Sequence, residues 1–105
     1  MPVTISHGTN KYGEEAFSAT TIANLGQHLA HVLSSRDWRT VAFLFNGQLR
    51  GPVTVPPRKA GQVSAALGRA VGHPLMPRGV WTEYAQAFAD AAQRAATARQ
   101  PWEWS

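Results

Sequence analysis

Residues 38–72 read WRTVAFLFNGQLRGPVTVPPRKAGQVSAALGRAVG, and the first half of this stretch decides the predicted sheet. Every residue of the run VAFLF is apolar, so a strand over residues 38–45 would be apolar on both faces, as in a strand covered on both sides. Asn46-Gly47 follows directly and is typical of a hairpin, because a type I′ turn needs positive φ at both central residues. We therefore predict a returning strand over residues 48–55, at the sheet edge because Pro52 cannot donate a ladder hydrogen bond.

The second half of the stretch predicts a helix over residues 57–71. Pro57 is well tolerated in the first turn of a helix, where its missing N–H would have no partner, and Gly72 is typical of the position just after a helix. Between them, apolar residues recur at helical spacing at Ala60, Val63, Leu67, Ala70 and Val71. We expect this face to pack on the core and the opposite face to contact solvent.

The residues before this stretch predict one strand and one helix. Val3 and Ile5 alternate with polar residues, as in a short strand, and residues 9–17 are expected to form a loop. Ser18 is a suitable N-cap residue, and apolar residues recur after it at helical spacing. We predict the first helix over residues 19–35.

The residues after the stretch predict a third helix over residues 78–98, which Pro101 would end. The resulting order is β-α-β-β-α-α, an α+β fold in which a small three-stranded mixed sheet is packed with three helices. A right-handed crossover would make its first two strands parallel. We expect a single domain over residues 1–100, followed by a tryptophan-containing C-terminal tail over residues 101–105.

Length and composition exclude several classes of protein. A chain of 105 residues has room for one core, and the lack of cysteine excludes a disulfide framework and any cysteine metal site. The longest apolar run has five residues, whereas a membrane-spanning helix needs about 20. The first eleven residues show no apolar secretory leader, so we expect a cytoplasmic protein without a membrane partner.

The basic charge is concentrated in the middle of the chain. The formal net charge is +4, but residues 36–78 alone carry +6 and each flank carries −1. The cations of this segment are Arg36, Arg39, Arg50, Arg58, Lys59, Arg69 and Arg78, against the single carboxylate of Asp37. Arginine binds phosphate and carboxylate through a planar fork of N–H donors, so the segment favours an anionic partner. A solvated surface in a protein from a GC-rich genome would produce the same composition.

The predicted second helix carries the best candidate for a binding site. Arg58 and Lys59 lie in its first turn, where the helix dipole disfavours cations unless an anion joins them. Our candidate residues for binding nucleic acid or another polyanion are Arg50, Arg58, Lys59, Gln62 and Arg69, provided that they share one face. A helix-turn-helix motif is disfavoured, because the outer face of the third helix carries Glu83 and Asp90, which a phosphate-lined groove would repel.

Two features predict contacts with a protein partner or with the rest of the fold. Trp102 and Trp104 would either fold back to cap the core or form an exposed aromatic anchor for a partner. Gly61, Ala65 and Gly68 leave one flank of the second helix nearly flat, which suits close contact with another helix. That helix would be the third helix of the same chain or a helix of a second copy in a homodimer.

The chain carries little that could perform catalysis. It has no cysteine nucleophile and none of the motifs G-x-S-x-G, G-x-x-x-x-G-K-[ST] and G-x-G-x-x-G. His28 and His31 have the spacing of one helix face but lack a third ligand, so they predict surface histidines rather than a metal site. We predict no catalytic residue, no metal and no cofactor, and keep a small enzyme built around His7 or His73 as a further hypothesis.

Four short segments carry a resemblance to other sequences: SHG at residues 6–8, GPVTVPP at 51–57, HPLMP at 73–77 and PWEWS at 101–105. With these segments the chain resembles small uncharacterised proteins of actinobacteria and of their phages and plasmids. The resemblance implies a bacterial, cytoplasmic accessory protein and transfers no catalytic residue.

The sequence therefore favours a non-catalytic binding module whose basic centre binds an anionic partner, nucleic acid first. Such binding should weaken as salt increases, because phosphate contacts release counterions. The alternative is a protein-interaction module, which would form a homodimer or act as an inhibitor or accessory factor of a larger bacterial or phage protein.

Overall fold

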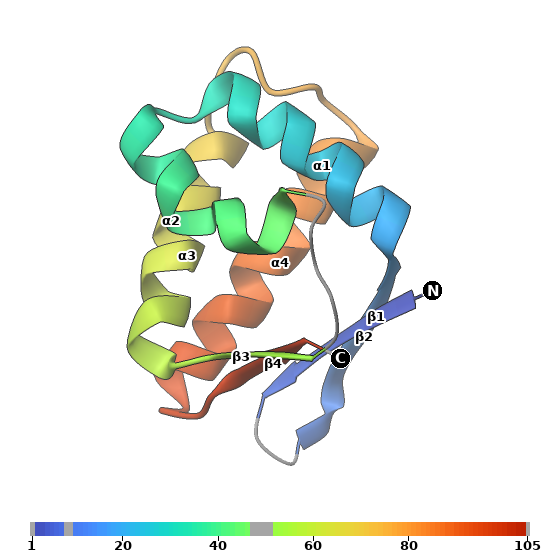
Figure 1. Ribbon diagram of the computed structural model, residues 1–105, viewed down its shortest axis with the longest axis vertical. Helices are drawn as coiled ribbons and strands as arrows, with labels where there is room; N and C mark the ends of the chain where they lie inside the picture. The colour runs from blue at the N-terminus through green and yellow to red at the C-terminus, as the bar shows by residue number, and fades with distance from the viewer. Residues whose placement is uncertain (1, 8–9, 47–51, 105) are drawn as a thin grey trace.

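The computed structural model describes residues 2–7, 10–46 and 52–104, which form four helices and a four-stranded antiparallel sheet (Figure 1). The elements are β1 (Pro2–His7), β2 (Asn10–Ser18), α1 (Ala19–Val32), α2 (Ser35–Phe45), β3 (Val53–Val55), α3 (Pro57–Val71), α4 (Val80–Thr97) and β4 (Trp102–Trp104). The α+β class is confirmed, but the predicted mixed sheet of three strands with three helices is wrong in its details. In Figure 1 the helices lie together over one face of the sheet.

The last strand of the chain lies inside the sheet. The strand order is β2-β1-β4-β3, and all three neighbouring pairs are antiparallel. Ile5 of β1 and Val53 of β3 both pair with Trp104 of β4, one from each side. The predicted parallel crossover between the first two strands is therefore wrong, and residues 102–104 contribute an inner strand instead of a tail.

The predicted central strand over residues 38–45 is wrong, because this segment belongs to α2. Ser34 caps the helix, and its hydroxyl oxygen accepts a hydrogen bond from the Asp37 N–H at 3.2 Å. The buried residues of α2 are Val41, Leu44 and Phe45, at the i, i+3 and i+4 positions of one helix face. A short apolar run satisfies a strand and a helix alike, and here the contacts of the folded chain select the helix.

Only part of the predicted hairpin falls on described residues. Asn46 ends α2, and its N–H donates to the Ala42 carbonyl at 2.8 Å, whereas residues 47–51 lie outside the described residues. Residues 53–55 form β3, which is an edge strand, as the proline at position 52 predicts. Because β3 pairs with β4 and the preceding element is a helix, the predicted hairpin pairing is wrong.

The remaining boundaries follow local sequence patterns with one exception. α3 spans Pro57–Val71, as predicted, and α4 spans Val80–Thr97 within its predicted range. α1 ends at Val32, three residues early, because Ser34 already caps α2. The expected loop over residues 9–17 is wrong, since most of it forms β2, a strand with few apolar residues and no alternating pattern.

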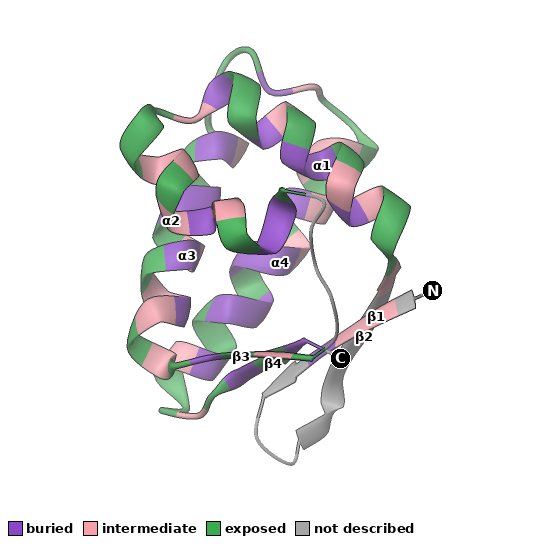
Figure 2. Cartoon of the chain, in the orientation of Figure 1, coloured by how far each residue is buried: buried purple, intermediate pink, exposed green. Residues whose placement is uncertain are grey.

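Aromatic side chains join the sheet to the helices. Trp104 stacks on Phe88 of α4 with ring centroids 5.2 Å apart, and Phe45 of α2 meets these rings edge-on at 5.6 and 5.3 Å. Figure 2 shows that the buried residues line the inner sides of the helices and the face of the sheet beneath them. The core therefore combines the middle of the chain with its C-terminal end.

α3 and α4 pack closely along their length (Figure 1). The Ser64 hydroxyl donates to the Ala89 carbonyl at 2.8 Å, and a Cβ added at Gly61 would lie 3.6 Å from the Cβ of Ala96. At Gly61 this flank of α3 therefore packs against a helix of the same chain, which is one of the two alternatives that the sequence predicts. A Cβ added at Gly68 would meet no atom within 4 Å, and Ala65 is exposed.

Gly68→Ala is expected to stabilise the protein by about 0.5–1 kcal/mol, because alanine costs less backbone entropy than glycine in a helix. Gly68 is exposed inside α3, and the added methyl group would make no clash. Urea unfolding followed by circular dichroism measures the change. Ala65→Gly, at an exposed position of the same helix, is the matched control and should destabilise by a similar amount. An unchanged or lower unfolding midpoint for Gly68→Ala would contradict the prediction.

Candidate anion-binding groove between α2 and α3

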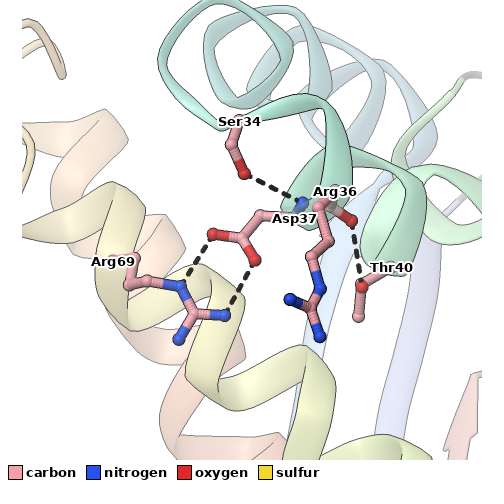
Figure 3. Close-up of polar contacts among 5 residues, drawn as sticks. All are labelled: Ser34, Arg36, Asp37, Thr40 and Arg69. Carbon is pink, nitrogen blue, oxygen red and sulfur yellow. Dashed lines mark hydrogen bonds and ion pairs between the residues drawn. The ribbon is translucent and has the colours of Figure 1, made fainter.

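A polar groove of about 550 Å³ lies between α2 and α3. It is lined by Arg36, Asp37 and Thr40 of α2 and by Gln62, Ala65 and Arg69 of α3. Figure 3 shows Asp37 and Arg69 joined across the two helices, with Arg36 on the same turn of α2 as Asp37. Two guanidinium groups from different helices therefore line one groove.

Local sequence features build the two walls of the groove. On α2, the Thr40 hydroxyl donates to the Arg36 carbonyl at 3.2 Å, and the four-residue spacing of these residues places them on one helix face. On α3, Gln62, Ala65 and Arg69 share a face by the same periodicity. The small side chain of Ala65 leaves room between the polar residues that precede and follow it.

Asp37 orients Arg69 at the edge of the groove. Arg69 donates from Nε to Asp37 Oδ2 at 2.7 Å and from Nη2 to Oδ1 at 2.8 Å, which is a bidentate ion pair. The hydrogen bond from Arg69 is the main cause that lowers the pKa of Asp37; desolvation opposes it, and the charges of Arg69 and Arg36 reinforce it. Asp37 is therefore ionised at neutral pH. The Arg69 side chain remains 60% exposed, so a ligand can reach its guanidinium group.

The first turn of α3 adds two further cations to this side of the molecule. Arg58 is exposed, and the Lys59 Nζ lies 5.6 Å from the centroid of the Phe43 ring of α2, a cation–π distance. Lys59 and Arg69 are ten residues apart in α3, which corresponds to about 15 Å along the helix axis. We call the groove together with Phe43 and Lys59 the α2–α3 surface.

The structure brings part of the predicted anion-binding set to this surface. Gln62 and Arg69 line the groove, Lys59 contacts Phe43 beside it, Arg58 is exposed in the first turn of α3, and Arg50 lies outside the described residues. The residues that sequence reasoning missed are Arg36 and Thr40, because a strand over residues 38–45 conceals their helical spacing. The serine N-cap at position 34, with Asp37 three residues later, is the sequence signal that indicates this helix.

Trp102 and Trp104 lie in the core, so neither ring is available on the surface as an anchor for a partner. Their side chains are 0% and 1% exposed, and both occupy the inner face of β4, whereas Glu103 between them is exposed. The structure thus agrees with the interpretation in which this segment folds back onto the core. A partner would have to bind elsewhere.

Other residues considered for chemistry are engaged in local contacts. The His28 ring lies 4.7 Å from the Trp81 ring between centroids, and His73 Nδ1 accepts a hydrogen bond from the Leu75 N–H at 3.1 Å. Within residues 2–7, 10–46 and 52–104, no three His, Asp or Glu side chains are grouped so that they could hold a metal ion. No helix in these same ranges combines the length and the apolar character needed to cross a bilayer.

The fold and the groove together define a small α+β domain with a basic groove between two surface helices. Residues 8–105 match the family model described as Domain of unknown function (DUF7739), and the chain belongs to this family. The matched range contains both helices of the groove and the inner strand β4. A search of curated proteins and a search of solved structures each found no match.

Proposed function

We propose that the protein is a small non-catalytic binding domain and that the α2–α3 groove binds an anionic partner, nucleic acid first. The observation that carries this proposal is that Arg36 of α2 and Arg69 of α3 line one groove. α2 and α3 together carry five of the ten basic residues of the chain, but only one carboxylate, that of Asp37. Thr40 and Gln62 add neutral hydrogen-bonding groups to the same lining.

The geometry of Arg69 suits phosphate recognition. A guanidinium group has five N–H donors, and Asp37 accepts two of them, so donors remain for phosphate oxygens. The ion pair also holds the guanidinium in one orientation before a ligand binds, which lowers the entropy cost of binding. Arg36 supplies a second fork from the opposite wall.

Fluorescence anisotropy with a short labelled DNA tests the proposal. Affinity should fall steeply between about 50 and 200 mM salt, because phosphate contacts release counterions. Arg69→Ala removes one such contact and should reduce the slope of log affinity against log salt by about 0.7–0.9. Arg78→Ala removes the same charge from an exposed position that does not line the groove and is the matched control. Absent or salt-insensitive binding would refute the proposal.

Substitution of Asp37 tests whether the ion pair with Arg69 affects ligand binding through the negative charge of Asp37 or through the orientation of Arg69. Asp37→Asn keeps the shape of the side chain and removes its negative charge from the groove, so binding should tighten by about two- to fivefold. Arg69→Ala breaks the same ion pair but should weaken binding. If both variants weakened binding, the orientation that Asp37 gives to the Arg69 guanidinium would matter more for binding than the negative charge of Asp37.

The alternative function is that of a protein-interaction domain, either a homodimer or an inhibitor or accessory factor of a larger bacterial or phage protein. Two exposed apolar residues near the start of α4 favour it, since Leu75 is 66% and Val80 46% exposed. Light scattering over a range of concentrations tests for the homodimer. A dimer that Leu75→Ser disrupts would support it, and a monomer at every concentration would refute it.

We also infer that the protein acts in the bacterial cytoplasm and is encoded by an actinobacterial chromosome, phage or plasmid. The resemblance of residues 6–8, 51–57, 73–77 and 101–105 to actinobacterial sequences supports this origin. The genes next to this one provide the test, because phage or plasmid genes around it would distinguish an accessory role from a chromosomal one.

A further inference from the structure

Phe43 is an unusual residue on the α2–α3 surface. It is 39% exposed, whereas the neighbouring apolar residues Val41, Leu44 and Phe45 of the same helix are buried. Phe43 follows Arg36 by seven residues and Thr40 by three, so it continues the row of α2 that lines the groove. A large aromatic ring therefore lies in line with the groove cations instead of in the core.

Lys59 adds a positive charge directly at this ring. Its Nζ lies 5.6 Å from the ring centroid, and Lys59 belongs to α3, the other wall of the groove. The α2–α3 surface thus has a cation and an exposed aromatic ring together at one end and two arginines at the other. These ends are separated by about 15 Å along α3, the length of about four stacked nucleotides at 3.4 Å each.

This combination distinguishes single-stranded from duplex nucleic acid. Proteins that bind single strands combine a basic groove for the phosphates with aromatic side chains on which bases stack. In a duplex the base faces are already stacked on one another, so an exposed phenyl ring offers duplex DNA no comparable contact. The arginines alone would bind both forms through their phosphates.

We propose that the α2–α3 surface binds single-stranded nucleic acid, with phosphates at Arg36 and Arg69 and a base stacked on Phe43. This inference rests on the proposed function and specifies its ligand. Lys59, whose ammonium group lies over the Phe43 ring in the free protein, moves from the ring to the phosphate next to the stacked base. The Phe43 ring thus supplies the preference for a single strand, while the arginines supply the salt-dependent part of the affinity.

Anisotropy titrations with three fluorescent oligonucleotides of equal length test the inference: oligo-dT, an abasic strand with the same phosphates, and a duplex. The wild-type protein should bind oligo-dT most tightly. Phe43→Ala should weaken oligo-dT binding by about tenfold, because base stacking is lost. Its binding to the abasic strand and its salt slope should stay unchanged, because no charge is removed.

Two further substitutions at position 43 control for packing. Phe43→Leu keeps an apolar side chain on α2 but cannot stack a base, so it should lose affinity as Phe43→Ala does. Phe43→Tyr keeps the ring and should bind within about threefold of the wild type. Leu75→Ala removes an exposed apolar side chain from outside the α2–α3 surface and should not change binding.

The outcomes separate this inference from the proposed function. If oligo-dT, the abasic strand and the duplex bind equally, or if Phe43→Leu binds oligo-dT like the wild type, the base-stacking inference is overturned. In that case a salt slope that Arg69→Ala reduces would still support the anion-binding groove. If none of the three oligonucleotides binds at low salt, both proposals are overturned.

Discussion

Trp104→Ala is expected to lower the free energy of unfolding by about 3–5 kcal/mol, a large part of the 5–15 kcal/mol that stabilises a typical domain. Trp104 is 1% exposed and stacks on Phe88, while Phe45 meets its ring edge-on. The same residue pairs with Ile5 and Val53 on the two neighbouring strands. Removing its side chain would leave a cavity where the sheet meets α2 and α4.

Chemical denaturation followed by far-ultraviolet circular dichroism measures this loss, with two variants of β4 as controls. Glu103→Ala changes the exposed residue of the same strand and should alter stability by less than about 0.5 kcal/mol. Trp104→Phe keeps an aromatic ring and should cost less than Trp104→Ala. It also breaks no hydrogen bond with the described residues, because the Trp104 indole N–H has no partner among them.

Shortening the chain provides a second measurement of the same contact. A chain that ends at Gln100 lacks β4, which joins β1 to β3 in the sheet. We expect this chain to lose the cooperative unfolding transition of the intact protein. If it unfolded at the same denaturant concentration as the intact protein, the insertion of β4 into the sheet would be refuted.

Gly26→Ala is expected to destabilise the protein by about 3 kcal/mol, although alanine is the better helix former by up to about 1 kcal/mol. Gly26 is buried in α1, and a Cβ at this position would overlap the carbonyl oxygen of Phe45 and lie 3.0 Å from the Phe45 Cβ. The overlapping atom belongs to the backbone, so it can move only if the C-terminal end of α2 moves away from α1. The clash therefore outweighs the gain in helix propensity.

Gly68→Ala is the matched control for this experiment, because it makes the same substitution inside a helix at a position where a Cβ meets no atom within 4 Å. The two variants should shift the midpoint of chemical denaturation in opposite directions. A Gly26→Ala protein as stable as the wild type would show that α1 and α2 do not approach each other this closely.

Elements whose signals lie within a few residues were predictable from the sequence. α3 is the clearest case, because Pro57, Gly72 and the apolar spacing between them are all local features, and its bounds agree with the prediction. Gln62 and Arg69 were identified as candidate binding residues for the same reason, since their place on the outer face follows from the helical period.

α2 shows why the other wall of the groove was not predictable in the same way. Its apolar run fits both the strand and the helix pattern. The predicted strand over residues 38–45 does not place Arg36 and Thr40 on one helix face opposite α3, as α2 does. The burial of Val41, Leu44 and Phe45 in the core favours the helix, and the ion pair between Asp37 and Arg69 joins α2 to α3. This ion pair joins residues that are 32 positions apart, and no local pattern encodes it.

The amino-acid sequence by itself determined the α+β class, the bounds of α3 and the concentration of positive charge between residues 36 and 78. The folded chain alone determined that residues 102–104 form an inner strand with both of its tryptophans buried, and that Arg36 and Arg69 share a groove. The physical reason is the range of the interactions. Helix caps and apolar periodicity act over one or two turns, whereas strand pairing and burial depend on residues up to about a hundred positions away, such as Ile5 and Trp104.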